Sequence, residues 1–341
     1  MTRIFVVDDS AFIRKALARV LGAESGLELV GVAASGSEAL EKIPEADPDL
    51  VTLDIAMPGM DGLGVLRALL RWKRTLKVVM LSAHTRQGTE ATIEALAAGA
   101  VDFIDKTSFN VMDFPTLRRE VIERLKALTS ANGDAAVPSP ASIAAADYPE
   151  KLAGASRCEL CVIGASTGGP IALQRILEHM PARFPMPVAI VQHMPVGFTG
   201  PFASRLSRLS RLRVSEAVDG DRLVPGRVLV APAGRHLRIT AGLGTLLTTE
   251  PHDAKHMPSI DLMMKSAARA RPGRILGILL TGMGQDGAEG MAAIRASGGV
   301  TIGESEESCV VYGMPRAAEL RSALDCLLPL SAIISFLGGL E

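Results

Sequence analysis

The sequence predicts an α/β fold divided between two domains. Apolar runs typical of strands alternate with amphipathic stretches typical of helices in both halves, which is the pattern of parallel sheets covered by helices. The chain has 341 residues, which is long for one compact domain. Residues 131–156 are rich in Ala, Ser and Pro, as linkers are. We therefore expect domains over 1–125 and 157–341, joined by a flexible linker over 126–156.

The first domain is expected to contain five strand–helix units. Apolar runs that suit buried parallel strands occupy residues 3–9, 27–35, 49–59, 77–85 and 101–108. Amphipathic stretches that suit helices occupy residues 11–23, 37–46, 63–72, 88–100 and 114–130. This alternation predicts a doubly wound, five-stranded parallel sheet.

The second domain repeats the alternation and adds a hairpin. Strands are expected over 159–166, 186–193, 227–232 and 274–284, and helices over 170–180, 259–270 and 288–299. The run HLRITAGLGTLLTTE, residues 236–250, has the pattern of an antiparallel hairpin that turns at Gly242–Gly244. A buried final helix is expected within 326–340. Together these elements predict a Rossmann-like α/β domain with an antiparallel hairpin.

The composition argues against several classes of protein. A net charge of −1 gives the whole chain no attraction to nucleic acid or to a membrane surface. No uninterrupted apolar run reaches the length of a membrane span, and the apolar run at the N-terminus is too short for a signal peptide. We therefore expect a cytoplasmic protein without membrane insertion.

Four cysteines raise the question of a zinc or redox site. Cys158 and Cys161 form a CxxC pair, while Cys309 and Cys326 stand apart. No second pair of cysteines or histidines stands at zinc-binding spacing, and Cys161 falls inside an apolar strand. Buried free thiols are the favoured interpretation.

Charged and hydroxyl side chains end the strands of the first domain. Asp8 and Asp9 end the first strand and Asp54 the third, while Ser82 ends the fourth and Lys106 the fifth. In a parallel sheet all five lie along the carboxyl edge, where such folds bind ligands. Crowded carboxylates repel one another unless a cation lies among them, and oxygen ligands favour Mg²⁺. A carboxylate could then accept a phosphoryl group beside the lysine; the alternative is that these residues only cap helices and shape turns.

Residues 1–125 resemble the response-regulator receiver domain, whose fold is flavodoxin-like. The motifs VVDDS, DIAMPGMDG, LSA and DFIDK occur in the family's order. The resemblance implies that Asp54 is the phosphoacceptor. It also implies that Asp9, Asp54 and the backbone carbonyl of Ala56 bind Mg²⁺, and that Asp8 supports the metal's water ligands.

Three further receiver roles follow from the same resemblance. Lys106 is implied to pair with the phosphoryl group, and Ser82 with Phe103 to form the switch that responds to it. A phosphoryl group adds a charge of about −1.5 to −2 at neutral pH, which is enough to rearrange a nearby loop.

The stretch GASTG in the second domain places Ser166 at the apex of a glycine-rich turn after a strand. It fits G-x-S-x-G, a pattern in which a serine projects from a sharp strand-to-helix turn, although the pattern alone is weak. A nucleotide-binding P-loop is excluded because no Gly-Lys-Ser/Thr follows. The glycine spacing fits a dinucleotide-binding fingerprint poorly, and a plain tight turn stays open.

A base and an acid stand where a serine nucleophile would need them. His193 ends the next strand, and Asp286 lies in a glycine-rich turn after the strand ILGILL. Ser166, His193 and Asp286 thus each follow the carboxyl end of a strand, where the sheet brings such residues together. The chain order Ser–His–Asp differs from that of α/β-hydrolases and disfavours that fold.

Two other patterns carry alternatives. His252 and His256 form H-x-x-x-H, a weak candidate for zinc because no helix or acidic third ligand is evident. Arg205, Arg208 and Arg211 recur every third residue beside leucines. The favoured interpretation is a solvated helix face over a leucine stripe, and the alternative is that these arginines steer an acidic partner toward the site.

The two halves together resemble the CheB family of chemotaxis receptor protein-glutamate methylesterases and protein-glutamine glutaminases. The stretches that carry this resemblance, most of residues 158–325, are VIGASTGGP, VQHMPVGFT, RVLVAPAGRHL, HMPSIDLMMKSAA and LTGMGQDGAEGM. The resemblance implies that Ser166 is the nucleophile, His193 the general base and Asp286 the orienting acid. Backbone N–H groups near Met283, assisted by Thr167, are implied to stabilise the oxyanion.

The family also implies partners and regulation. The expected substrates are methyl-accepting chemoreceptors and the expected phosphodonor is a chemotaxis histidine kinase, with Mg²⁺ in the receiver and no cofactor in the catalytic domain. We expect a monomer whose receiver covers the catalytic face until Asp54 is phosphorylated.

One alternative is a DNA-binding output, but residues 157–341 carry 19 Lys and Arg against 16 Asp and Glu, a net charge of only +3, and show no helix-turn-helix pattern. A second alternative is an adaptor without catalytic activity.

Overall fold

The computed structural model describes residues 1–83, 85–106, 114–130 and 150–340. The chain divides into two compact units, Met1–Ala136 and Val137–Glu341, and each is considered by itself. The helix α5 (Phe114–Ser130) and the 3₁₀ helix η2 (Glu150–Arg157) extend into the two ends of the expected linker over 126–156. Its central residues lie outside the described ones, so the division at residues 125 and 157 stays a prediction.

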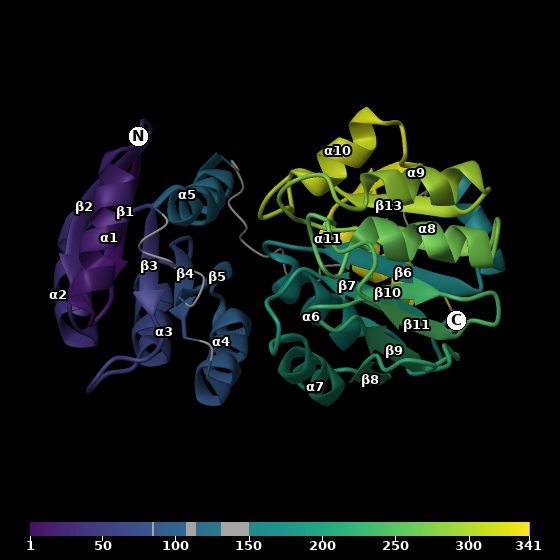
Figure 1. Cartoon of the computed structure of the whole chain (residues 1–341), viewed down its shortest axis with the longest axis horizontal. Helices are drawn as coiled ribbons and strands as arrows, with labels where there is room; N and C mark the ends of the chain where they lie inside the picture. The colour runs from purple at the N-terminus through teal and green to yellow at the C-terminus, as the bar shows by residue number, and fades with distance from the viewer. Residues whose placement is uncertain (84, 107–113, 131–149, 341) are drawn as a thin grey trace. The chain divides into compact units, whose positions relative to one another are not determined.

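The N-terminal unit is a five-stranded parallel sheet in the order β2-β1-β3-β4-β5 (Figure 1). Its strands are β1 (Thr2–Val7), β2 (Leu27–Ala33), β3 (Leu50–Asp54), β4 (Lys77–Ser82) and β5 (Asp102–Asp105). Besides α5, its helices are α1 (Ala11–Gly22), α2 (Gly36–Ala46), α3 (Gly62–Trp72) and α4 (Arg86–Ala98). Because α1 contacts α5 while α3 contacts α2 and α4, the helices form two groups that cover the two faces of the sheet.

Local sequence explains where the helices of this unit begin. Ser10, Ser35, Asp61 and Thr85 precede α1 to α4, and each side chain accepts a hydrogen bond from a backbone N–H of the first turn. At the start of α3, a Cβ on Gly62 would lie 2.1 Å from the backbone oxygen of Asp54. Only glycine therefore lets α3 begin this close to the end of β3.

The C-terminal unit is a seven-stranded parallel sheet in the order β14-β13-β12-β6-β7-β9-β8. Its strands are β6 (Leu160–Ala165), β7 (Val188–Gln192), β8 (Arg213–Glu216), β9 (Arg227–Val230), β12 (Ile275–Leu279), β13 (Val300–Glu304) and β14 (Cys326–Leu328). Its α-helices are α6 (Gly169–His179), α7 (Thr199–Leu209), α8 (Ile260–Ala270), α9 (Ala288–Ala296), α10 (Met314–Leu320) and α11 (Leu330–Gly338). The hairpin strands β10 (His236–Ile239) and β11 (Thr245–Thr248) pair antiparallel, as predicted.

The fold class predicted from the sequence is confirmed in both units. In the C-terminal unit β7, β9 and β8 lie on one side of β6, and the later strands β12, β13 and β14 lie on its other side. The strand order therefore reverses between β6 and β12, and the carboxyl ends of strands at such a switch point are where open α/β sheets place their ligands.

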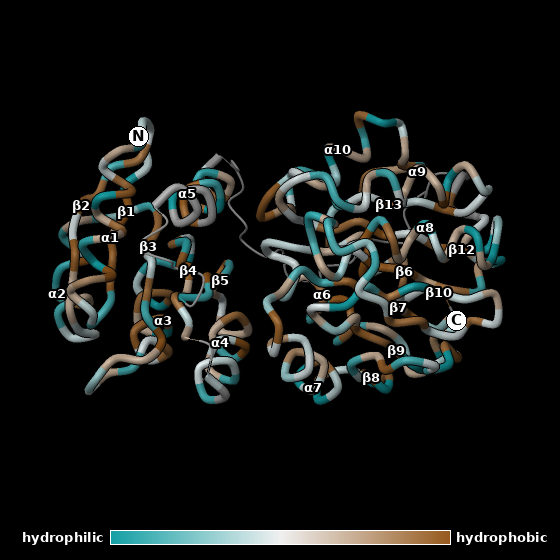
Figure 2. Tube along the Cα trace, viewed as in Figure 1, coloured by the Kyte–Doolittle hydropathy of each residue, from teal (hydrophilic) through white to brown (hydrophobic). Residues whose placement is uncertain are grey.

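One hydrophobic core of the C-terminal unit lies between this sheet and the helices α8 and α9. Val162, Val191 and Leu279 are fully buried on the sheet side, against Met263 and Met291 on the helices. Figure 2 shows hydrophobic residues concentrated along β6 and β7 in the interior of this unit. This packing holds the strand ends that carry the functional side chains in fixed positions.

Among the described residues, no helix combines the length and the apolar character needed to cross a membrane.

Candidate functional site

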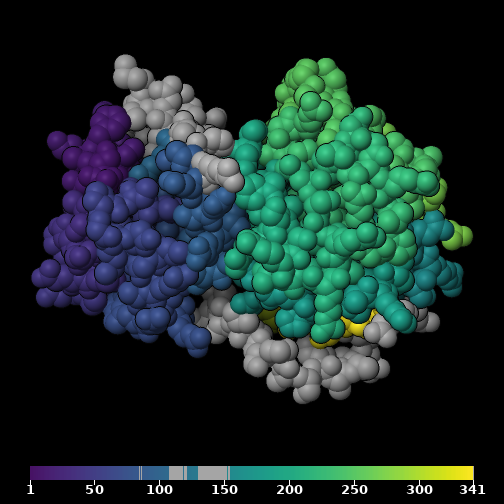
Figure 3. Space-filling view, turned by 90° about the horizontal axis from the view of Figure 1, so that it is seen from below, coloured from purple at the N-terminus to yellow at the C-terminus, as the bar shows by residue number. Residues whose placement is uncertain are grey.

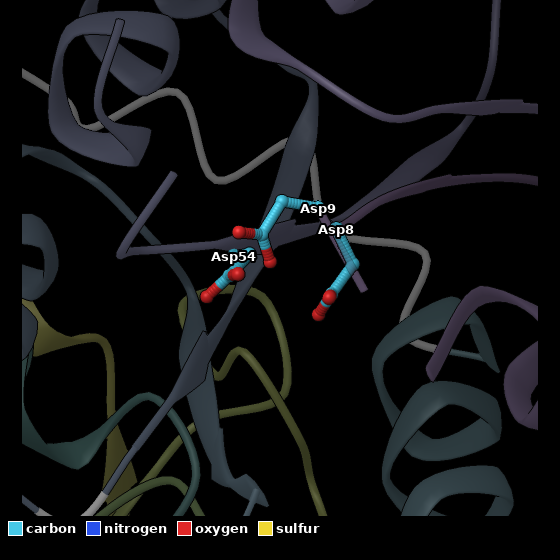
Figure 4. A group of neighbouring side chains, drawn as sticks. All are labelled: Asp8, Asp9 and Asp54. Carbon is cyan, nitrogen blue, oxygen red and sulfur yellow. The ribbon is translucent and has the colours of Figure 1, made fainter. Parts of the chain in front are cut away.

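The first site is a cluster of three carboxylates in the N-terminal unit. Asp8 and Asp9 follow β1, Asp54 ends β3, and one carboxylate oxygen of each lies within 4.8 Å of the others. Figure 4 shows the three side chains side by side at these strand ends. Asp8 and Asp54 are buried, whereas Asp9 is exposed. The sheet thus brings together the three carboxylates that the sequence predicted to lie at one edge.

Lys106 connects two of these carboxylates from the end of β5. Its Nζ lies 2.8 Å from Asp8 Oδ2 and 2.7 Å from Asp54 Oδ2. Burial raises the pKa of Asp54 to about 6, the negative charge of Asp8 acts in the same direction, and Lys106 opposes both. A further cation beside Asp54 would therefore favour its ionised form.

The donor set of this cluster fits a magnesium ion. All three side chains offer oxygen, which hard divalent cations prefer, and two are buried at a point where their charges repel. The backbone N–H of Ala56 donates to Asp54 Oδ1 at 3.2 Å, so this residue lies beside the cluster, as expected for one whose carbonyl would complete the site.

The two expected switch residues lie in the neighbouring strands. Ser82 ends β4 and is buried, with its Oγ 2.6 Å from Oγ1 of Thr92 on α4. Phe103 is buried in β5. Their roles as a switch stay predictions.

The second site lies at the switch point of the C-terminal sheet. Ser166 follows β6, His193 follows β7, and Asp286 lies in the turn between β12 and α9. Because β12, β6 and β7 are neighbours in the sheet, their carboxyl ends bring the three residues to one edge. The sequence predicted this convergence from strand ends alone.

The turn that carries Ser166 is held by its backbone. Its N–H donates to the carbonyl of Thr281 at 3.1 Å, and its own carbonyl accepts from the N–H of Gly169 at 2.8 Å. Gly168, at the end of the turn, has φ +80°, a conformation that favours glycine. A Cβ on Gly282 would lie 2.7 Å from Ser166 Cβ, so the β12 turn approaches the serine closely only because residue 282 is glycine.

His193 is bound to the acid through the nitrogen distal to its backbone. Its Nε2 lies 2.8 Å from Asp286 Oδ2, and both side chains are largely buried. With Nε2 carrying the proton toward the carboxylate, Nδ1 carries the lone pair. Nδ1 is buried and hydrogen-bonded to no group among the described residues. A general base at this position would therefore use Nδ1.

Asp286 accepts hydrogen bonds from the start of α8 as well as from His193. Ser259 Oγ lies 3.0 Å from Oδ1, the N–H of Asp261 donates to Oδ1 at 3.0 Å, and that of Ile260 donates to Oδ2 at 2.8 Å. Burial alone would raise the pKa of Asp286, but the hydrogen bond and charge of His193, together with the two backbone donors, hold it well below the usual value. The carboxylate thus stays ionised and fixes the imidazole.

Asp261, on α8, holds the start of α9, which directly follows the turn that carries Asp286. Its Oδ1 accepts from the backbone N–H of Gly287 at 3.0 Å and of Gly290 at 2.6 Å, at the start of α9. Asp286, just before α9, caps α8, and Asp261, on α8, caps α9. Each of the two aspartates thus accepts hydrogen bonds from the first turn of the other's helix, and both helix starts hold Asp286 in place.

A second histidine covers His193. The rings of His193 and His256 stack with centroids 4.3 Å apart and planes 16° apart. The sequence pattern indicated His256 only as a weak zinc candidate together with His252. In the structure, His252 Nε2 instead lies 2.9 Å from Glu250 at an exposed position. The two histidines of the H-x-x-x-H pattern therefore have different neighbours, and His256 belongs to the surroundings of the base.

Of the two residues expected near the oxyanion, one lies in the serine turn and the other in the neighbouring turn between β12 and α9. Thr167 is buried directly after Ser166, and its carbonyl accepts from Thr281 Oγ1 at 2.9 Å. Met283 is half-buried and follows Gly282, the residue that packs against Ser166 Cβ. Their role as oxyanion donors stays a prediction.

The arginine-rich stretch lies away from this edge. Arg205 and Arg208 are on α7 and Arg211 follows it; Arg208 and Arg211 are exposed, while Leu206 and Leu212 are buried. α7 leads from the carboxyl end of β7 to the amino end of β8, so these arginines approach the edge opposite the catalytic residues. α7 and β8 lie at the lower border of this unit in Figure 1, and Figure 3 views the molecule from that side. The solvated-face interpretation fits this position.

The cysteines lie as the sequence predicted. Cys158, Cys161 and Cys309 are buried, Cys326 is partly buried, and none of the four forms a disulfide. Burial raises the pKa of Cys158 to about 11 and that of Cys161 still further, which keeps both thiols protonated and unreactive.

Sequence reasoning missed three supporting residues. Ser259 precedes α8 and accepts from the N–H of Leu262, a cap that the run PSIDL indicates. Gln192 precedes His193 inside an apolar strand, and Thr281 follows an apolar strand. A buried polar residue next to a candidate site was the available signal for both.

Comparison with known proteins agrees with this architecture. Residues 4–113 match the family model of the response regulator receiver domain, and residues 161–337 match that of the CheB methylesterase. Protein-glutamate methylesterase/protein-glutamine glutaminase 5 of Myxococcus xanthus is 43% identical over 342 residues, which cover 98% of this chain and 97% of the relative. The corresponding protein 1 of Carboxydothermus hydrogenoformans is 44% identical and covers 97% of this chain and 96% of its own. The crystal structure of the Thermotoga maritima CheB methylesterase catalytic domain matches with 38% identity and a TM-score of 0.52, covering 54% of this chain and 99% of that one.

A receiver unit with a carboxylate cluster, followed by a Rossmann-like unit of methylesterase type, defines a response regulator with an enzymatic output domain. The family match covers more than half of the chain, and full-length relatives share about two-fifths of its residues. The chain belongs to the CheB methylesterase family.

Proposed function

We propose that this protein hydrolyses glutamate methyl esters on chemoreceptors and deamidates glutamines there, with Ser166 as nucleophile, His193 as general base and Asp286 as the acid that orients it. The observation that carries the proposal is the pairing of His193 Nε2 with Asp286 at 2.8 Å, which leaves a buried Nδ1 without a partner among the described residues, at the sheet edge that also carries Ser166. The full-length relatives named above carry the name of this activity.

In the first half of the reaction, Ser166 Oγ attacks the γ-carbonyl carbon of the methylated glutamate while His193 Nδ1 takes the hydroxyl proton. The resulting oxyanion is stabilised by backbone N–H groups near Met283, assisted by Thr167, and each such donor is typically worth about 10²–10³ in rate. The bond to the methoxide then breaks, and the methoxide leaves as methanol with the proton from Nδ1. The product is an ester between the glutamyl γ-carbonyl and Ser166.

In the second half, water replaces methanol. His193 Nδ1 removes a proton from the water, the resulting hydroxide attacks the glutamyl ester, and Ser166 Oγ leaves with that proton. A glutamine substrate follows the same course and releases ammonia in place of methanol, so the imidazolium must protonate a poorer leaving group. The low pKa of Asp286 supports this cycle because its carboxylate stabilises the imidazolium in both halves.

The direct test is methanol release from fragments of a methylated chemoreceptor, with ammonia release from glutamine-containing fragments measured in parallel. We expect methanol to appear and the methyl content of the fragment to fall in equal amounts. Binding of the fragment without release of either product would instead support the adaptor alternative.

We further propose that phosphorylation of Asp54 raises this activity. Asp54 is expected to take the phosphoryl group of a histidine kinase, with Lys106 beside the transferred oxygens. Asp9, Asp54 and the carbonyl of Ala56 would hold Mg²⁺, with Asp8 supporting its water ligands, and the ion when bound offsets the negative charge of the phosphoryl group. The added charge next to Lys106 would give Ser82, now close to Thr92, a new hydrogen-bond acceptor.

Replacing Asp54 with asparagine is expected to abolish the stimulation of methanol release by a small-molecule phosphodonor with Mg²⁺. The basal rate should change by less than about twofold because Asp54 belongs to the N-terminal unit, whereas Ser166, His193 and Asp286 all belong to the C-terminal unit. Glu41→Gln, at an exposed position on α2, is the matched control and should keep the full response. Stimulation of Asp54→Asn equal to that of the wild type would contradict gating through this carboxylate.

A further inference from the structure

A buried glutamine joins the candidate nucleophile to the candidate base. Gln192, the last residue of β7, is 1% exposed. Its Nε2 donates to the backbone carbonyl of Ser166 at 2.9 Å and to that of His193 at 3.1 Å. One amide group thus contacts the backbone of both residues on which the proposed reaction depends.

The position of this amide continues a backbone ladder that ends there. Ala165 pairs with Gln192 at the end of the β6–β7 register, and the N–H of His193 donates to the carbonyl of Ala165 at 3.1 Å. Beyond this point the chain turns into α6 on one side and into a loop on the other. The side chain of Gln192 supplies the next link, from β7 to the carbonyl of Ser166.

The partners decide which way the amide faces. Two carbonyl oxygens can only accept hydrogen bonds, so the NH₂ group must point at them and Oε1 must point away. Oε1 is buried and has no hydrogen-bond partner among the described residues, which is costly for a buried polar atom. A Cβ on Gly169 would lie 2.2 Å from this Oε1, so the amide also fills the space that a glycine leaves at the start of α6. The two donated hydrogen bonds and this close fit hold the amide in one orientation between the two backbones.

We propose that Gln192 is a positioning residue that fixes the separation of Ser166 and His193. This inference rests on the proposed function, in which Ser166 must transfer its proton to His193. Misplacement of reacting groups by about 1 Å costs on the order of 10²-fold in rate. Gln192 sets this separation through the two backbones, and it contacts neither substrate nor the reacting atoms.

The test compares Gln192→Leu and Gln192→Glu with the wild type on methylated receptor fragments. Gln192→Leu keeps the approximate shape but loses both donated hydrogen bonds, and its kcat should fall by about 10- to 100-fold with KM changed by less than about twofold. Gln192→Glu turns a carboxylate oxygen toward two carbonyl oxygens and should lose more at pH 8. Gln174→Leu, at a half-buried glutamine on α6, is the matched control and should keep the wild-type kcat.

The pH dependence separates positioning from packing. A buried carboxyl at position 192 has a raised pKa, and its protonated form can again donate to one carbonyl. The kcat of Gln192→Glu relative to wild type should therefore rise as the pH falls from 8 to 6, while the ratio for Gln192→Leu stays constant. Dividing each rate by the wild-type rate at the same pH removes every pH effect that all variants share.

Two results would overturn the inference. One is a wild-type kcat in Gln192→Leu, and the other is equal and pH-independent losses of kcat in both variants together with a large loss of thermal stability.

The Ser166→Ala protein is included in the same series. If Ser166→Ala released methanol at the wild-type rate, the proposed function would fail. If it were inactive while both Gln192 variants were fully active, only the positioning role would fail.

Discussion

Replacing Ser166 with alanine is expected to reduce methanol release from a methylated receptor fragment by about 10⁴- to 10⁶-fold, the loss typical of removing a serine nucleophile. The reason is that Ser166 Oγ supplies the atom that forms the covalent ester, and the alanine side chain has no group that can replace it. The measurement is the steady-state rate of methanol release at saturating fragment, with and without a phosphodonor.

The fold should survive this substitution. The structural contacts of Ser166 are made by its backbone N–H and carbonyl, which alanine keeps. Ser204→Ala, at an exposed position on α7, is the matched control and should keep the wild-type rate. If Ser166→Ala kept more than about a tenth of the activity while folding normally, a serine-ester mechanism would be wrong.

Replacing Asp286 with asparagine is expected to lower kcat by about 10⁴-fold, because the imidazole would lose the carboxylate that fixes its tautomer and stabilises its cation. The two oxygens of Asp286 face four donors, from His193, Ser259 and the backbone N–H groups of Ile260 and Asp261. Whichever way an asparagine amide turns, its NH₂ group meets one pair of these donors. The variant should therefore also unfold more easily, by about 2–4 kcal/mol at pH 7.

The stability difference between wild type and Asp286→Asn should depend on pH in a defined direction. The pKa of Asp286 is lowered in the folded protein, so its ionised form contributes stability above the ordinary unfolded pKa of about 3.9. That contribution is lost as the pH falls toward the lowered value. Urea unfolding of both proteins between pH 3 and pH 8 should show the largest gap at neutral pH and a shrinking gap below about pH 4. A gap that stays constant or widens in acid would contradict the inferred ionisation of Asp286.

The sheet topology of the catalytic unit was only partly predictable. Runs such as LCVIGA and VAIVQ are long and apolar because they lie at the centre of a sheet buried on both faces. The strands β8, β13 and β14 were missed. β8 is a short edge strand with polar residues, β14 has three residues directly before α11, and β13 contains a threonine, a glycine and a glutamate. Such segments form strands because neighbouring strands offer hydrogen bonds, which their own sequence does not reveal.

The candidate sites were predictable to the extent that strand ends define them. Asp8, Asp54 and Lys106 could be predicted to lie together because parallel strands end at one edge of the sheet. For the same reason Ser166 and His193 could be predicted to lie at one edge. Which nitrogen of His193 faces Asp286 could not be predicted from strand ends, because it depends on the side-chain orientations at the start of α8. The amide of Gln192 was missed for a similar reason, since its partners are backbone carbonyls that carry no sequence signal.

The measurement that tests the central claim most directly is the identification of the covalent intermediate. Wild-type protein is mixed with a methylated receptor fragment, quenched with acid within the first turnover, and digested with trypsin. The peptide spanning residues 158–175 contains Ser166 and ends at Arg175. We predict that part of this peptide carries the mass of the glutamyl fragment as an ester at Ser166, in step with the methanol released, and that Ser166→Ala gives no adduct. Methanol released in the first turnover with the adduct on another residue, or with residue 166 unmodified at every quench time, would contradict the account.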